Sequence, residues 1–148
     1  MRLTTFCLLF LLSCDLTGPG DSVPLTSASL AGKWELVQRV LSSTNPVLSD
    51  TKEISENGTL YEFTRLGSAK EFCRCGGIGP SSLVSAYSIS GDTLRLQTSE
   101  NPAFETYVAE LWTHQLILRG IGTFPHDING DGILEDVTLT RTFQRMND

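Results

Sequence analysis

Apolar and polar residues alternate in short segments along most of this chain of 148 residues. Tyr61 and Phe63, for example, alternate with Glu62 and Thr64. Alternation with a period of two over four to eight residues is typical of strands that bury one face. The pattern therefore predicts strands over residues 33–41, 59–66, 69–75, 83–89, 93–98, 105–112, 115–120 and 137–143.

Turn-forming residues separate these segments at short intervals. Asn57-Gly58 is typical of a tight hairpin, and the stretch from Gly76 to Pro80 breaks the chain again. No long stretch keeps a helical period, although residues 29–41 could begin with a helical turn. We therefore expect an all-β domain with a single up-and-down antiparallel barrel of about eight strands, whose closure removes the exposed sheet edges. A β-sandwich is the alternative.

The N-terminus indicates export. Arg2 precedes an apolar run, residues 6–12, that is too short to span a bilayer, so residues 1–13 are predicted to be a signal peptide. The stretch Leu11-Leu12-Ser13-Cys14 resembles a bacterial lipobox, in which the cysteine is lipidated and becomes the new N-terminus. We expect an acyl anchor at Cys14 that attaches the protein to a membrane of the bacterial cell envelope. An ordinary secretory signal with a chance cysteine is the alternative.

Residues 14–29 are small, polar and interrupted by Gly and Pro, which predicts a flexible tether before a domain over residues 30–148. The chain has 11 basic and 17 acidic residues, a formal net charge of −6. Loss of Arg2 with the signal peptide would make that charge −7. A negative balance argues against nucleic-acid binding and against electrostatic attraction to anionic lipid.

Three stretches carry a resemblance to a known family. Leu30-Ala31-Gly32-Lys33-Trp34 resembles the G-x-W element that opens the first strand of lipocalins. Residues 86–94, AYSISGDTL, resemble the mid-chain hairpin of the bacterial, Bacteroidetes-type lipocalin-like lipoproteins, and residues 139–143, LTRTF, complete the likeness. It extends over about residues 30–145. The resemblance implies a lipocalin-like barrel that holds a small apolar ligand.

In lipocalins the tryptophan of the first strand packs against an arginine of the last strand and closes one end of the barrel. The resemblance implies that Trp34 pairs with Arg141, or as a second choice with Arg145, through a cation–π contact of about 1 kcal/mol. The alternative is that Trp34 is a core aromatic residue and Arg141 an exposed strand residue.

The stretch DINGDGILED, residues 127–136, presents oxygen atoms at alternate positions, as calcium-binding loops do. The candidate ligands are Asp127, Asn129, Asp131, the carbonyl of Ile133, Glu135 and Asp136. Thr138 stands where an EF-hand has its bidentate glutamate, so the loop resembles more closely the shorter calcium loops of FG-GAP repeats. We predict a structural calcium ion that stabilises the last hairpin. A polar hairpin without metal is the alternative.

Cys73 and Cys75 are the candidates for a disulfide. Neighbours on the same face of a strand lie about 6.6 Å apart, near the upper limit of the range of about 4.4–6.8 Å for disulfide Cα atoms. A local disulfide therefore needs a bend, which Gly76-Gly77 could provide. Free or otherwise partnered thiols are the alternative. A redox-active pair is disfavoured, because only Arg74 would lower a thiol pKa.

The sequence contains no nucleophile elbow and no metal-ligand helix pattern, and His114 and His126 fall in different predicted turns. We therefore expect a monomeric, non-enzymatic, lipid-anchored envelope protein that binds a small apolar ligand. The alternative is an envelope module that presents its loops to a protein or glycan partner. An open apolar lumen would favour the first, and a filled lumen with an exposed apolar patch the second.

Overall fold

The computed structural model describes residues 20–43, 51–54, 59–73, 82–97 and 104–147. Its elements are α1 (Ser27–Leu30), β1 (Gly32–Ser43), β2 (Thr51–Ile54), β3 (Thr59–Phe63), β4 (Ser68–Cys73), β5 (Ser82–Ser90), β6 (Thr93–Gln97), β7 (Phe104–Leu111), β8 (Gln115–Gly120), β9 (Phe124–His126) and β10 (Glu135–Arg145). All pairings between these strands are antiparallel.

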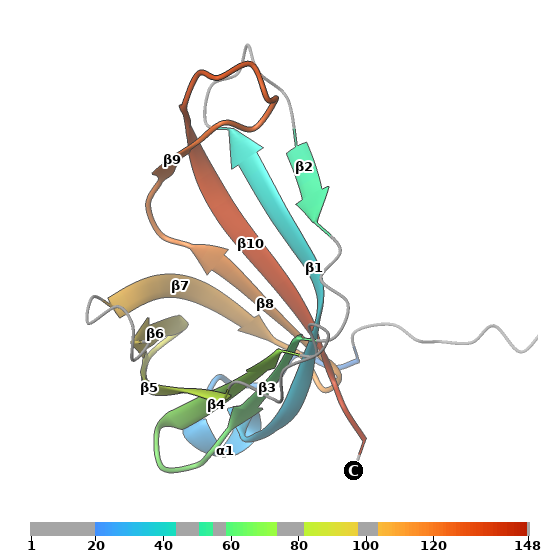
Figure 1. Cartoon of the computed structure of the whole chain (residues 1–148). Helices are drawn as coiled ribbons and strands as arrows, with labels where there is room; N and C mark the ends of the chain where they lie inside the picture. The colour runs from blue at the N-terminus through green and yellow to red at the C-terminus, as the bar shows by residue number, and fades with distance from the viewer. Residues whose placement is uncertain (1–19, 44–50, 55–58, 74–81, 98–103, 148) are drawn as a thin grey trace, which may run out of the picture.

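Eight of the strands close into a barrel. They follow the order β1-β3-β4-β5-β6-β7-β8-β10, and β10 pairs back onto β1, so neighbours in the barrel are neighbours in the chain once β2 and β9 are set aside. The predicted all-β, up-and-down antiparallel barrel is therefore confirmed, and the sandwich alternative is wrong. In Figure 1 the barrel occupies the lower half of the view, where the lower parts of the long β1 and β10 lie beside the other six barrel strands.

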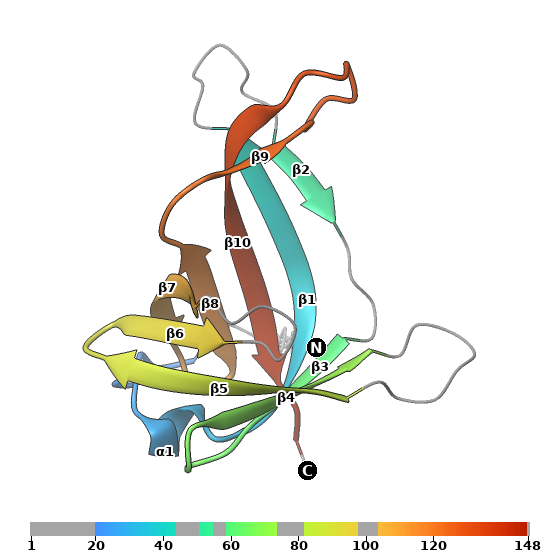
Figure 2. The same ribbon diagram turned by 60° about the vertical axis from the view of Figure 1, so that its left-hand side comes forward.

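The upper parts of β1 and β10 extend beyond the barrel (Figures 1 and 2). There β2 pairs with residues 39–42 of β1, and β9 pairs with residues 135–137 of β10. Neither strand was predicted, because segments of four and three residues are too short to show alternation, and Pro125 is atypical of a strand interior. This extension has its own small apolar core of Leu41, Ile128, Val137 and Leu139.

The predicted flexible tether is wrong from Gly20 onward. Ser22 forms a β-bridge with Trp112, and Thr26 caps α1 through a capping box with Ser29. The side chain of Leu30, at the end of α1, is fully buried against the barrel core. Apolar side chains within the Gly- and Pro-containing stretch, together with the cap, therefore fix this segment on the barrel.

Buried apolar side chains fill the lower half of the lumen, beside α1. They include Leu30, Trp34, Leu36, Phe63, Tyr87, Leu94, Leu96, Leu111, Leu116, Leu118 and Phe143. The rings of Tyr61 and Phe143 meet edge to face, with centroids 5.2 Å apart. Aromatic and leucine side chains packed in this way form a hydrophobic core in the lower lumen.

The arginine that closes this end is Arg145, and the expected pairing of Trp34 with Arg141 is wrong. Arg145 lies opposite Trp34 in the β1–β10 register, with its guanidinium carbon 4.2 Å from the centroid of the tryptophan ring. Arg141 lies four residues away along β10, which is about 13 Å at 3.3 Å per residue. The closed end, as we name it, consists of Leu30, Trp34 and Arg145.

Two further predictions fall wholly or partly outside the described residues. Cys14 and the predicted signal peptide lie there, as do Cys75 and the side chain of Cys73. Within the described ranges, no helix has the length and apolar character needed to cross a membrane.

Candidate ligand-binding site

Two arginines face each other across β1 and β10 on the lumen side of the barrel. The inward residues of β10 alternate as Val137, Leu139, Arg141 and Phe143, so Arg141 interrupts an apolar series. On β1 the register shifts between Leu36 and Gln38, which places Arg39 directly opposite Arg141. The register shift therefore brings two like charges together in the upper lumen.

Arg141 is held by an aromatic ring and a carboxylate. Its guanidinium carbon lies 5.5 Å from the centroid of the Tyr107 ring, and its Nη2 atom lies 3.7 Å from Oε2 of Glu105. The Tyr107 hydroxyl donates a 2.5 Å hydrogen bond to that same Glu105 oxygen. The side chain of Arg141 is only 16% exposed. An aromatic face and a carboxylate thus stabilise a largely buried cation.

Two tyrosine hydroxyls in this region stay protonated. Burial raises the pKa of Tyr61 and of Tyr107 well above the usual value of 10.0, although the positive charge of Arg141 acts in the opposite direction on both. Hydrogen bonds to Glu71 and to Glu105, respectively, add to the increase in pKa. Each hydroxyl is therefore a neutral donor to a carboxylate at neutral pH.

A cavity of about 450 Å³ opens beside these groups, at the end of the lumen opposite the closed end. It is lined by Arg39, Glu105, Thr106, Tyr107, Gly120, Ile121, Gly122, Thr123, Phe124, Leu139 and Arg141. We call this cavity the mouth. Gly120 lies opposite Tyr107 in the β7–β8 register, and a Cβ atom there would come within 3.2 Å of the Leu139 carbonyl oxygen. Gly120 thus permits close strand approach and adds no side chain to the lumen.

Sequence reasoning singled out Arg141 for a different contact and missed Arg39, Glu105 and Tyr107 as site residues. The interruption of an inward apolar series by Arg141 is the signal that could have indicated the mouth. No such signal exists for Arg39, because its inward position depends on the irregular register of β1.

The predicted calcium loop connects β9 and β10 at the far end of the extension. The Asp127 carboxylate accepts hydrogen bonds from the backbone N–H groups of Gly130, at 2.6 Å, and Gly132, at 2.8 Å. The bond from Gly132 is the largest cause of a lowered pKa for Asp127. Asn129 and Asp131 hydrogen-bond each other and the following backbone. Side chains of the loop thus accept hydrogen bonds from its own backbone N–H groups, as in Asx turns.

Glu135, another candidate calcium ligand, bonds to the backbone of the loop. Its side chain is buried, and Oε2 accepts a hydrogen bond from the backbone N–H of Ile128. Within the described residues, no three or more His, Cys, Asp or Glu side chains gather in a metal-binding arrangement. The carboxylates retain lone pairs that a cation could use. The calcium site therefore stays a prediction.

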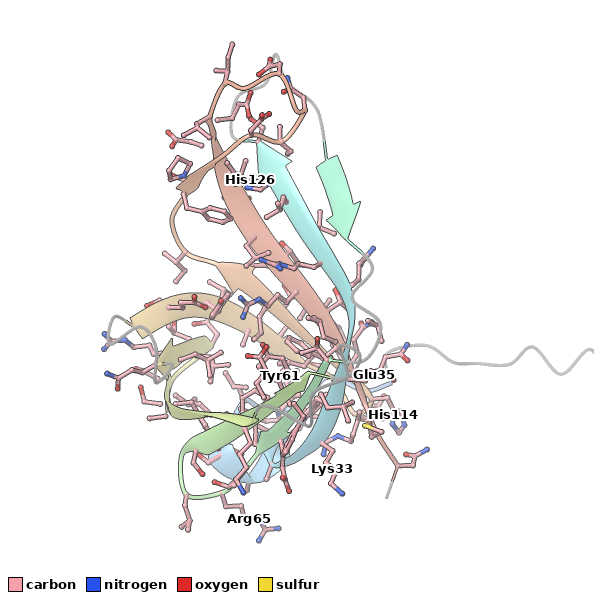
Figure 3. All side chains as sticks on the ribbon, viewed as in Figure 1. Lys33, Glu35, Tyr61, Arg65, His114 and His126 are labelled. Atoms are coloured by element: carbon pink, nitrogen blue, oxygen red, sulfur yellow. The ribbon has the colours of Figure 1, made fainter. Side chains whose placement is uncertain are left out.

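The two histidines lie at opposite ends of the molecule, with His126 in the extension and His114 near the closed end (Figure 3). They share no site, as their positions in different turns of the sequence predicted.

The fold has a structural relative. A lipocalin-like protein from Bacteroides uniformis, known from a crystal structure, superimposes with a TM-score of 0.52 at 17% sequence identity. The match covers 80% of this chain and 99% of that protein. No family model matches the sequence, and no curated protein is found to match it. The fold is thus lipocalin-like, as the sequence resemblance implied.

Proposed function

We propose that the protein binds a small, largely apolar ligand in the mouth of its barrel. The observation that carries this proposal is the cavity of about 450 Å³, which lies within the range of about 300–1,000 Å³ typical of small-molecule sites. Leu139, Phe124 and Ile121 supply apolar contacts, and a small number of polar side chains lie beside them. A few polar groups in an apolar pocket are the usual means of orienting a ligand.

The contrast within the lumen supports this location. The lower half is a packed core around Trp34 and Phe143, whereas the mouth is open and is bordered by partly exposed apolar residues. Phe124 is 37% exposed and Ile121 57% exposed. Their exposed apolar surface would be buried by a ligand, which favours binding by about 25 cal/mol per Å².

Binding of a neutral apolar fluorescent probe, N-phenyl-1-naphthylamine, tests the proposal. We expect saturable binding to the wild-type protein and a loss of at least about tenfold in affinity for Thr123→Trp, because an indole at the rim occupies the cavity. The matched control is Leu66→Trp, at a position that is 95% exposed in the turn between β3 and β4. Absence of saturable binding, or equal affinity of Thr123→Trp and wild type, would contradict the proposal.

The alternative, a module that presents its loops to a protein or glycan partner, has one observation in its favour. Ile133 and Leu134 are both 65% exposed in the loop between β9 and β10. Two adjacent exposed apolar side chains are a small patch compared with typical interaction surfaces. Two results together would favour this alternative: the probe does not bind, and Ile133→Ser abolishes binding of a protein or glycan that binds the wild-type protein. Lipid attachment at Cys14 and structural calcium remain predictions from the sequence.

A further inference from the structure

Among the described residues, the lining of the mouth carries two arginines and one glutamate. Arg39, Arg141 and Glu105 are its charged lining residues. Like charges directly opposite each other on paired strands are destabilising, yet Arg39 and Arg141 lie in this arrangement. The cost of placing two guanidinium groups there falls when an anion binds beside them.

The carboxylates near the mouth already accept hydrogen bonds from tyrosines. Glu105 accepts a hydrogen bond from Tyr107, and Glu71, outside the cavity lining, hydrogen-bonds with Tyr61. The side chain of Glu105 is 44% exposed, so solvent weakens its 3.7 Å ion pair with Arg141. Glu105 therefore leaves N–H donors of Arg141 available to a further anion.

Arg141 retains hydrogen-bonding capacity. A guanidinium has five N–H donors in a planar fork. Within the described residues, Arg141 forms the 3.7 Å ion pair with Glu105 and the contact with the Tyr107 ring, and it interacts electrostatically with Tyr61 and Glu71. It forms no hydrogen bond within 3.5 Å to the described residues. A buried fork with unused donors is suited to a carboxylate or a phosphate, which it can bind through two parallel hydrogen bonds.

From this arrangement we propose that the ligand is an amphiphile with an oxyanion head group, bound by Arg39 and Arg141, and an apolar tail against Leu139, Phe124 and Ile121. This inference rests on the proposed function, because it assigns the chemistry of a ligand bound in the same mouth. The arginines lie within the lumen, and Phe124 and Ile121 lie toward the rim. The head group therefore enters first, and the tail contacts the rim.

Three probes with the same tail and different head groups test the inference: dodecanoate, dodecanol and dodecylammonium. The two ionic probes are kept below their micelle-forming concentrations and dodecanol below its solubility limit. Isothermal titration to the wild-type protein is expected to give affinities in that order. Dodecanoate should bind at least about tenfold more tightly than dodecanol, because one charge-assisted hydrogen bond contributes enough free energy for a tenfold difference in affinity.

The matched variants are Arg39→Gln and Arg141→Gln, which remove the charge and the guanidinium fork but keep a polar side chain that can form hydrogen bonds. Each should reduce the preference for dodecanoate over dodecanol to about threefold or less, and leave dodecanol affinity within about threefold of wild type. If Arg141→Gln folds poorly, Arg39→Gln still tests the inference. The control is Arg95→Gln, on the outward face of β6, which should keep the wild-type preference.

The outcomes separate the two proposals. Equal affinity for dodecanoate and dodecanol, or tightest binding of dodecylammonium, would overturn the oxyanion inference and leave small-ligand binding intact. Retention of the full preference in both arginine variants would also overturn it. Failure of all three probes to bind would overturn the proposed function and the inference with it.

Discussion

Two arginines on the inward face of β10, four residues apart, are used in opposite ways. Arg145 stacks on Trp34, and its three nitrogen atoms donate hydrogen bonds to backbone carbonyls: Nε to Thr113 at 3.1 Å, Nη1 to Ala31 at 3.1 Å and Nη2 to Ser29 at 2.6 Å. Arg141 stacks on Tyr107 but has only a loose ion pair with Glu105. Each arginine stacks on an aromatic ring. The two differ in the hydrogen bonds of their N–H groups, since Arg145 donates to three carbonyls and Arg141 has only the loose ion pair.

The difference separates a structural arginine from one that we propose to bind a ligand. The carbonyls that accept from Arg145 belong to α1, to the residue that follows it and to the turn between β7 and β8. This side chain therefore joins β10 to two other segments at the closed end. The donors of Arg141 lie beside a cavity and are available to a ligand. Donors that bond to backbone carbonyls at one end stabilise the fold, and unused donors at the other are suited to a ligand.

The largest expected effect is on the free energy of unfolding when each of the two arginines is replaced by glutamine. Arg145→Gln should lower the free energy of unfolding by about 2–4 kcal/mol, because it removes a cation–π contact and three charge-assisted hydrogen bonds. Arg141→Gln should lower it by less than about 1.5 kcal/mol, since it removes one loose ion pair and one ring contact. Urea unfolding at neutral pH measures both.

Arg145→Lys is the control for charge. A lysine keeps the positive charge but cannot direct donors to three separate carbonyls, so we expect it to restore only a minor part of the lost stability. A larger loss for Arg141→Gln than for Arg145→Gln would contradict the assignment of a structural role to the closed end.

Calcium should act on the extension above the mouth and leave the closed end unchanged. A loop of the extracellular type, with a dissociation constant of about 10⁻⁴–10⁻³ M, would add about 1.4–2.7 kcal/mol of stability at about 10 mM calcium. Thermal melting with calcium and with chelator measures the gain, and magnesium and Asp127→Asn are the controls. Hydrogen exchange should slow between β9 and β10 but not around Trp34. Identical melting curves would contradict the calcium prediction.

The smallest effect concerns the two tyrosines, which make the mouth sensitive to alkali. Burial raises the pKa of Tyr61 and Tyr107 above 10, so above pH 10 the folded protein binds more protons than the unfolded chain. Their contribution to stability is therefore complete below pH 10 and is lost as the pH rises further. Tyr107→Phe should remove about 1 kcal/mol of the decline between about pH 9 and about pH 11. An unchanged decline would contradict the burial of this hydroxyl.

The barrel could be predicted because alternation is a local signal. Each barrel strand carries inward apolar residues at every second position, as at Leu94 and Leu96 in β6, and turn residues separate the strands. The strands β2 and β9 were missed because each pairs only with the overhanging part of a longer strand. These two strands form only because β1 and β10 extend beyond the other barrel strands. The length of that extension is a property of the whole fold and is not visible in the short segments themselves.

The site could not be predicted to the same degree, because it depends on register. The sequence suggested that an arginine of the last strand packs against Trp34. The register between β1 and β10 places Arg145 in that position. The same offset, with the irregularity after Leu36, places Arg39 opposite Arg141. A shift of β10 by one residue would turn Arg141 and Arg145 to the other face. Only the interruption of the apolar series by Arg141 was visible beforehand.

The central claim is that the mouth binds a ligand while the closed end is a packed core. Methyl chemical shifts during titration with dodecanoate test it most directly, with Leu139 and Ile121 as reporters of the mouth and Leu36 and Leu116 as reporters of the packed core. We predict saturable shifts and tail-to-methyl NOEs at Leu139 and Ile121, with Leu36 and Leu116 unperturbed. Shifts centred on Leu36 and Leu116, or no shifts at Leu139 and Ile121, would contradict the account.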